Sequence, residues 1–157
     1  MMKIVESKGD VLKVKADLIC HQVNCLGVMG AGLAKQVKEQ YPKVYEEYLH
    51  FVKTFKKDHL PLLGMVQYCY LDNKRDIANV FGQEYIGTKG RMTNYDALRE
   101  AFTNIARYIS SCKLKTVAIP KYFGCGLAGG DWDTVLGIIT DALNDLDITL
   151  EIVEFAK

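Results

Sequence analysis

Apolar residues recur along this chain with two alternating periods. Short apolar or weakly alternating runs, typical of strands, are separated by stretches in which apolar residues recur every three to four positions, as in helices. The predicted strands are Lys3–Ser7, Leu18–Val23, Leu62–Leu71, Asp76–Phe81, Thr116–Pro120 and Ile148–Phe155. This alternation of strands and helices predicts a three-layer α/β/α fold, in which a central mixed, mostly parallel sheet is covered on both faces.

Four helices are predicted between these strands. Apolar residues recur at helical spacing from Leu33 onward, but Pro42 interrupts the pattern, so one helix should end near Tyr41 and another begin near Pro42. A third helix should cover roughly Tyr95–Cys112, and Asp131 should cap a fourth that runs to about Leu143. No internal repeat or linker is evident, so we expect a single domain over residues 1–157.

Two glycine-rich segments, Gly27–Gly32 and Gly124–Gly130, each lie between a predicted strand and a predicted helix. In α/β sheets ligands bind at the carboxyl ends of the strands, and glycines let backbone N–H groups surround an anion near a helix N-terminus. A tight turn that needs glycine would explain one such loop, but two in one small domain favour a binding site for a diphosphate. Neither segment matches the P-loop or the GxGxxG dinucleotide motif.

Composition narrows the classes of partner. The 20 Lys and Arg nearly balance 19 Asp and Glu, which argues against a general grip on a nucleic-acid backbone, although a local basic patch stays open. Five cysteines without CxxC spacing suggest neither a disulfide framework nor a zinc site, and we expect no metal and no cofactor. The start MMKIVESKGD lacks the apolar stretch of a signal peptide, and no segment is apolar enough to span a bilayer. We therefore expect a cytoplasmic monomer.

Long motifs in this chain resemble a known family. The string HQVNCLGVMGAGLAKQVKEQYP, from His21 to Pro42, resembles the first ligand loop of macrodomains, which bind ADP-ribose. IPKYFGCGLAGGDW, from Ile119 to Trp132, resembles their second loop, and Gly9-Asp10-Val11 matches their GD(I/V) turn. The similarity spans essentially the whole chain. It is strongest to the branch that contains terminal ADP-ribose protein glycohydrolase, the DNA-ADP-ribose hydrolase antitoxins and the yeast-type ADP-ribose-1″-phosphate phosphatase.

This resemblance implies a set of ligand-binding residues. Asp10 would accept a hydrogen bond from the adenine amino group with Val11 beside it, and Asn24 would face the distal ribose. Phe155 would lie near the adenine, although a core aromatic on an end strand explains it equally well. The residues implied to wrap the distal ribose and diphosphate are Gly30, Ala31 and Gly32 on one side, and Gly124, Cys125, Gly126 and Leu127 on the other. The implied partner is ADP-ribose or a derivative, including ADP-ribosylated protein or nucleic acid.

The implied chemistry departs from that of the glycohydrolases. Those members use a lysine shortly after the middle strand and an aspartate after GCGL, whereas this chain has Gln83 and Ala128 at these places. Glutamine cannot act as an amine nucleophile, so a covalent lysine mechanism is not expected. The titratable groups close to the motifs are His21 and Asp131, a candidate acid/base pair that the phosphatase-type members suggest. A buried, hydrogen-bonded histidine and a helix-capping aspartate are the competing interpretations.

Two functions therefore follow from the sequence. The first is a hydrolase that removes a terminal phosphate from ADP-ribose-1″-phosphate or cleaves ADP-ribose from protein or nucleic acid. The alternative is a non-catalytic ADP-ribose reader, which the missing lysine and aspartate favour. A domain without any nucleotide ligand is disfavoured by the two glycine loops.

Overall fold

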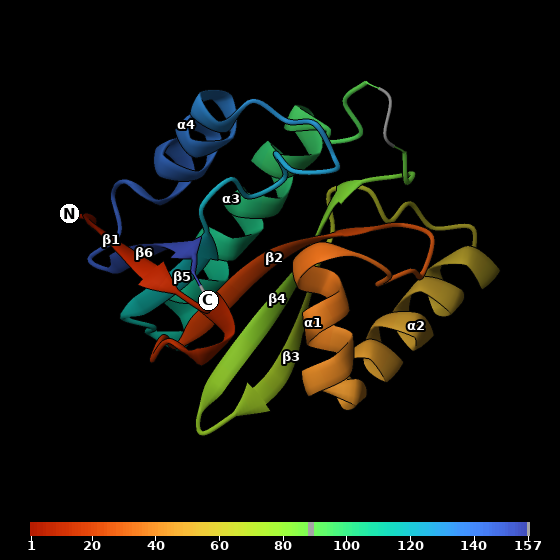
Figure 1. Cartoon of the computed structure of the whole chain (residues 1–157), viewed down its shortest axis with the longest axis horizontal. Helices are drawn as coiled ribbons and strands as arrows, with labels where there is room; N and C mark the ends of the chain where they lie inside the picture. Colours follow the sequence, from red (N-terminus) through yellow and green to blue (C-terminus); the bar gives the residue numbers. More distant parts are fainter. Residues whose placement is uncertain (88–89, 157) are drawn as a thin grey trace.

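Six strands form one mixed sheet in the computed structural model, which describes residues 1–87 and 90–156 (Figure 1). The strands are β1 (Lys3–Gly9), β2 (Leu18–Asn24), β3 (Val66–Asp72), β4 (Arg75–Gln83), β5 (Thr116–Pro120) and β6 (Thr149–Phe155). Their order in the sheet is β1-β6-β5-β2-β4-β3. Each neighbouring pair is parallel except β3 and β4, which are joined by a tight turn and run antiparallel. The predicted mixed, mostly parallel sheet is confirmed.

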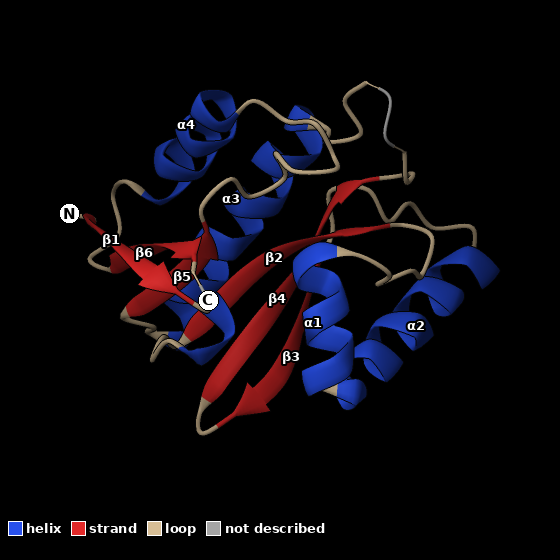
Figure 2. Cartoon of the chain, viewed as in Figure 1, coloured by secondary structure: helices blue, strands red, loops and turns tan. Residues whose placement is uncertain are grey.

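Helices cover both faces of this sheet, as Figure 2 shows. The helices are α1 (Gly32–Gln40), α2 (Pro42–Lys57), α3 (Tyr95–Cys112) and α4 (Trp132–Leu143), with a short 3₁₀ turn, η1, at Val11–Lys13. Alternate residues of β2 enter different cores, because successive side chains of a strand point to opposite faces. Leu18 and Cys20 pack with α3 and α4, whereas Ile19 and Val23 pack with α1 and α2.

Most predicted boundaries agree with the structure, and one strand is shorter than expected. The strand predicted over Leu62–Leu71 begins only at Val66, because the preceding residues form a turn in which Met65 N–H donates to Leu62 O. Gly64 adopts a left-handed backbone in this turn, with φ of +91°. The break at Pro42 lies where it was predicted, with proline in the first turn of α2.

The topology brings the functional candidates to one edge of the sheet. Because β2, β4, β5 and β6 run in the same direction as β1, their carboxyl ends meet at that edge. Both glycine-rich loops lie there, one after β2 and one after β5. Across the described ranges, no helix is both long and apolar enough to cross a membrane.

Gly137, in the middle of α4, gives a test of this packing. A Cβ atom added there would meet nothing within 4 Å. We expect Gly137→Ala to stabilise the protein by about 0.5–1 kcal/mol, because alanine restricts the unfolded chain and favours the helix. Urea unfolding followed by circular dichroism measures this change.

Gly82 provides the opposite case. A Cβ atom at this residue would clash with Gln22 Oε1 and with Leu98 Cδ2. Gly82→Ala should therefore destabilise the protein. A loss of stability in Gly137→Ala, or none in Gly82→Ala, would contradict the packing described.

Candidate ligand-binding site

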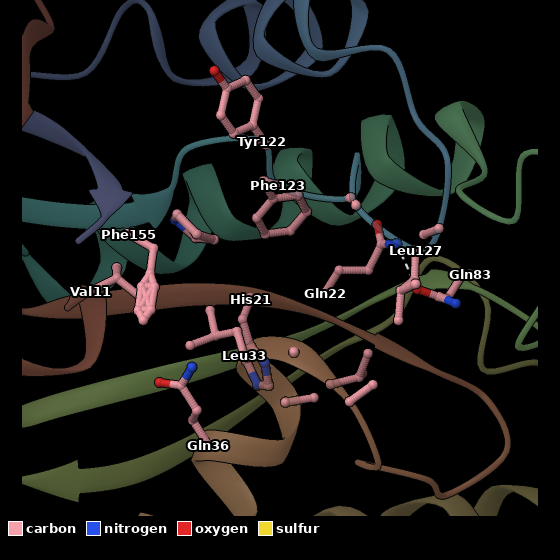
Figure 3. A pocket seen from close by; sticks show the side chains of 18 of the residues that line it. Val11, His21, Gln22, Leu33, Gln36, Gln83, Tyr122, Phe123, Leu127 and Phe155 are labelled. Atoms are coloured by element: carbon pink, nitrogen blue, oxygen red, sulfur yellow. Dashed lines mark hydrogen bonds between the residues drawn. The ribbon is translucent and has the colours of Figure 1, made fainter. Parts of the chain in front are cut away.

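A cavity of about 800 Å³ opens at the carboxyl edge of the sheet (Figure 3). The last residue of every parallel strand lines it; these residues are Gly9, Asn24, Gln83, Pro120 and Phe155. The remaining wall comes mainly from the two glycine-rich loops and the first turns of α1. A cavity of this size at this edge is suited to a nucleotide-sized ligand.

Asn24 and Tyr48 hold the first loop in shape. The Asn24 amide donates to Val28 O at 2.8 Å, and its Oδ1 accepts from Leu26 N–H at 3.0 Å. The hydroxyl of Tyr48, a fully buried side chain of α2, lies 2.6 Å from Asn24 O and 2.9 Å from Oδ1. Asn24 thus lines the cavity, as its predicted role requires, while its side chain fixes the loop.

The first loop leads directly into the N-terminus of α1. Gly32 begins this helix with φ of +58°, and Gly30, Ala31 and Gly32, which were predicted to bind the ligand, all line the cavity. Within the described part of the chain, no side chain caps this end, and its first turn holds no acidic residue. The unpaired N–H groups and the positive end of the helix dipole are therefore left to the cavity, an arrangement that favours an anion.

The second loop requires glycine at position 124. Gly124 has φ of +69°, and a Cβ atom there would lie 2.9 Å from Gln22 Oε1. Its carbonyl accepts from Gly130 N–H at 2.9 Å and from the Thr93 hydroxyl at 2.6 Å, which ties the loop to the segment before α3. At Gly126, by contrast, a Cβ atom would meet only open space. Gly124, Gly126 and Leu127, which were predicted to bind the ligand, line the cavity.

Gln22 is a cavity residue that the sequence analysis did not identify. Its amide nitrogen donates to Gln83 Oε1 at 2.8 Å and to the Thr93 hydroxyl at 2.9 Å. Gln83, in turn, donates to Tyr85 O at 2.9 Å. Gln83 lines the cavity, at the place where the glycohydrolases are expected to carry their lysine. Both the oxygen and the NH₂ group of its amide are hydrogen-bonded. The sequence signal that could have identified Gln22 is a polar residue within an apolar central strand.

His21 lies in the cavity wall but is almost fully buried, with 1% of its surface exposed. Its Nε2 lies 2.5 Å from Asn79 Oδ1 on the neighbouring strand β4. Its Nδ1 is buried and has no hydrogen-bond partner among the described residues. Burial lowers the pKa of His21 to about 4, against the opposing effect of the bond to Asn79. The imidazole is therefore neutral at neutral pH.

Asp131, the other half of the predicted acid/base pair, has a different position. Its carboxylate accepts from Thr134 N–H at 3.0 Å and from the Thr134 hydroxyl at 2.9 Å, and thereby caps α4. It is not among the residues that line the cavity. The structure thus gives Asp131 the helix-capping arrangement and does not bring it to His21 at the cavity.

Cys125 also departs from the predicted binding set. It is not among the lining residues, because its thiol turns back to Phe123 O at 3.2 Å and packs against the core beneath α3 and α4. Burial raises the pKa of this thiol to about 11, and the charge of Asp131 adds to the effect. The neutral thiol therefore resembles a small apolar core residue.

Asp10, Val11 and Phe155, which the resemblance assigns to the adenine, all line the cavity. Asp10 Oδ1 accepts from Leu12 N–H at 2.9 Å, and Figure 3 shows Val11 beside Phe155. Phe155 is 62% exposed, which disagrees with the interpretation of a core aromatic. An exposed aromatic ring beside a valine can cover one face of a flat ligand group.

Two other lining residues lie within the quoted motifs but were not predicted to bind the ligand. Gln36 of α1 and Tyr122, after β5, both contribute to the wall. Tyr122 has an unusual positive φ of +67° and packs edge-on against Trp132, with ring centroids 5.8 Å apart. Such backbone geometry is set by the surrounding loop, so residue type alone could not indicate it.

The chain is similar to known proteins along most of its length. The model of the family described as Macro domain matches residues 20–139. The Mycobacterium tuberculosis protein named DNA ADP-ribosyl glycohydrolase is 28% identical over 145 residues, which cover 91% of this chain and 39% of that protein. The chain spans about two fifths of the length of the first curated relatives it matches.

Two solved structures extend this similarity. The macrodomain of Mycobacterium tuberculosis DarG is 25% identical, with a TM-score of 0.82 over 98% of both chains. Thermosipho africanus DarTG in complex with ADP-ribose is also 25% identical, with a TM-score of 0.76 over 93% of this chain and 40% of that chain.

The lowered pKa of His21 predicts how stability depends on pH. The unfolded chain takes up a proton on this histidine below its ordinary pKa of 6.5, whereas the folded protein does so only near pH 4. The stability that neutral His21 contributes is therefore complete above pH 6.5 and is lost as the pH falls toward 4. We expect His21→Gln, which cannot be protonated, to reduce this loss by up to about 3 kcal/mol.

Urea unfolding of both proteins between pH 7.5 and 4 measures the difference. His50→Gln serves as the matched control, because His50 is exposed and its replacement should leave the native pH dependence in place. Equal pH dependence in the native protein and His21→Gln would contradict the burial of a neutral His21.

Proposed function

Because this chain belongs to the macro domain family, we propose that its cavity binds ADP-ribose. The observation that carries this proposal is the convergence of two glycine-rich loops and an uncapped helix N-terminus on one cavity of about 800 Å³. Backbone N–H groups and a helix dipole form an anion site that suits a diphosphate. The solved complex of Thermosipho africanus DarTG with ADP-ribose supports the same ligand.

The side chains at the two ends of the cavity suggest how the ligand would lie. Val11 and the exposed ring of Phe155 offer apolar surface for the adenine, and Asp10 retains one carboxylate oxygen for its amino group. The diphosphate would then lie between Gly32 and Gly126, with the distal ribose toward Gln83. Asp10 and Lys121 are the charged side chains in the described lining, so we propose that backbone dipoles provide most of the attraction for the phosphates.

We further propose that the protein hydrolyses a bound ADP-ribose derivative. It would either cleave the link between ADP-ribose and an acceptor or remove a terminal phosphate. His21 is the candidate for this chemistry, because it lies in the cavity wall with an unpaired Nδ1. A conjugate acid with a pKa of about 4 makes it a weak base. Its proposed role is therefore to accept a hydrogen bond and orient a hydroxyl or a water.

The alternative is an ADP-ribose reader without catalysis. The neutral, hydrogen-bonded amide of Gln83 favours it, and so does the capping position of Asp131. Neither residue supplies a nucleophile or a proton to the cavity. The catalytic proposal therefore depends on His21, while the binding proposal does not.

Gly126 provides the test of binding. Gly126→Val would fill the space beside the second loop without a clash in the protein, since its Cβ atom meets nothing within 4 Å. We expect the dissociation constant for ADP-ribose to rise about tenfold to a hundredfold, as measured by calorimetry. Gly137→Ala is the control, because that glycine is not among the residues that line the cavity.

The outcomes of this experiment are distinct. Native affinity in Gly126→Val would contradict the proposed place of the ligand. An absence of binding to the native protein at millimolar ADP-ribose would contradict the proposed function as a whole.

Three substrates separate the hydrolase from the reader. ADP-ribose-1″-phosphate, glutamate-linked ADP-ribosyl protein and ADP-ribosylated DNA are each incubated with the native protein and with His21→Gln. We expect one substrate to be turned over by the native protein and more slowly by the variant. If all three survive while ADP-ribose binds, the reader is supported, and if His21→Gln retains full activity, His21 is not the catalytic group.

A further inference from the structure

A series of hydrogen-bonded side-chain amides leads from α2 to His21 across two strands. The Gln67 amide nitrogen, on β3, donates to the backbone carbonyl of Glu47 in α2 at 3.0 Å. Asn79, on β4, donates from its amide nitrogen to Gln67 Oε1 at 3.0 Å. Asn79 Oδ1 then faces His21 Nε2 at 2.5 Å. Asn79 is fully buried and Gln67 is half-buried.

The direction of each hydrogen bond in this series of amides follows from its first acceptor, the backbone carbonyl of Glu47. The carbonyl of Glu47 can only accept, so Gln67 must present its NH₂ group to it and its oxygen to Asn79. Asn79 must then use its own NH₂ group toward Gln67, which leaves Oδ1 toward His21. An oxygen acceptor at this place requires a proton on His21 Nε2. In the neutral imidazole the other nitrogen, Nδ1, is then unprotonated.

We propose that Asn79 and Gln67 are positioning residues that hold His21 as the neutral tautomer protonated at Nε2, so that Nδ1 is a hydrogen-bond acceptor in the cavity wall. This inference rests on the proposed ADP-ribose-binding function. Nδ1 has no partner among the described residues, and it is a buried atom of an imidazole that lines the cavity, so we infer that a bound ligand supplies its partner. Neither Asn79 nor Gln67 is among the residues that line that cavity.

The tautomer decides which chemical groups His21 can accept. An unprotonated nitrogen pairs with a hydroxyl or a water, both of which donate hydrogen bonds. It repels the oxygens of a phosphate, which at neutral pH are mainly acceptors. The position of Nδ1 is therefore selective for a ribose hydroxyl or a water, and the phosphates are left to the backbone N–H groups of the two loops.

The tautomer is read directly by nitrogen NMR of the ¹⁵N-histidine-labelled protein, because protonated and unprotonated ring nitrogens resonate far apart. The His21 signals are assigned by their loss in His21→Gln. We expect native His21 at pH 7 to show protonated Nε2 and unprotonated Nδ1 in one tautomer, whereas exposed His50 and His59 should give averaged signals. A native His21 protonated at Nδ1 would overturn the inference without any variant.

Two variants test the amide chain. Asn79→Leu removes the acceptor, so both tautomers should appear, and the dissociation constant for ADP-ribose should rise about tenfold. Gln67→Met leaves Asn79 in contact with His21 but removes the group that orients it, so a smaller shift in the same direction is expected. The control is Tyr68→Phe, which removes a hydrogen bond to Asn104 from the same strand on the other face and should leave His21 unchanged.

Addition of ADP-ribose completes the test. We expect the Nδ1 resonance of the native protein to shift as it accepts a hydrogen bond. Binding by calorimetry without this shift would overturn the inference and leave the proposed function intact. Lack of binding would contradict the proposed function, while the tautomer of His21 would still be measured independently. An unchanged tautomer in folded Asn79→Leu and Gln67→Met would also overturn the inference.

Discussion

The polar side chains of the central strand form hydrogen bonds to neighbouring elements, and the architecture of the cavity depends on which elements these are. β2 lies in the middle of the sheet and is apolar in its first half, but then carries His21, Gln22 and Asn24. An unpaired polar group in such a place costs about 1–3 kcal/mol. The hydrogen bonds of these three side chains therefore connect three separate parts of the chain at the cavity.

Each of these partners constrains a different wall. The carbonyl and amide of Asn24 bind Tyr48, which fixes the first loop to α2. The amide of Gln22 reaches Thr93 and thereby the carbonyl of Gly124, which fixes the second loop to the start of α3. His21 is held by strand β4 through Asn79. Both glycine loops and the histidine are thus set by one strand before any ligand is present.

Neutral side chains and helix ends determine the electrostatic character of the cavity. His21 is neutral, Gln83 is an amide, and Asp131 is occupied at the N-terminus of α4. The N-terminus of α1, by contrast, has no side-chain cap within the described residues. The two helix ends are therefore treated differently: the one away from the cavity is neutralised by its own aspartate, and the one at the cavity is left for a ligand.

Much of this could be predicted from the sequence, because it depends on local rules. The spacing of apolar residues predicted the sheet, Pro42 predicted the break between α1 and α2, and the two glycine loops predicted where the cavity lies. The role of Asp131 was ambiguous, since a capping aspartate and a catalytic one have the same sequence context. Gln22, Asn79 and Gln67 could not be linked, because strand register decides which side chains meet, and register is a tertiary property.

The amide at position 83 also restricts the chemistry that the proposed function can use. Gln83 Oε1 accepts from Gln22 and its NH₂ group donates to Tyr85, so rotation of the amide would break both bonds. A group held in this way forms a neutral wall, and a neutral amide is too weak a nucleophile to attack a ribose. Bond cleavage in this cavity would therefore not use a nucleophile at position 83, which favours direct hydrolysis by water. In that case the water needs an acceptor that orients it, and a buried neutral histidine can provide one.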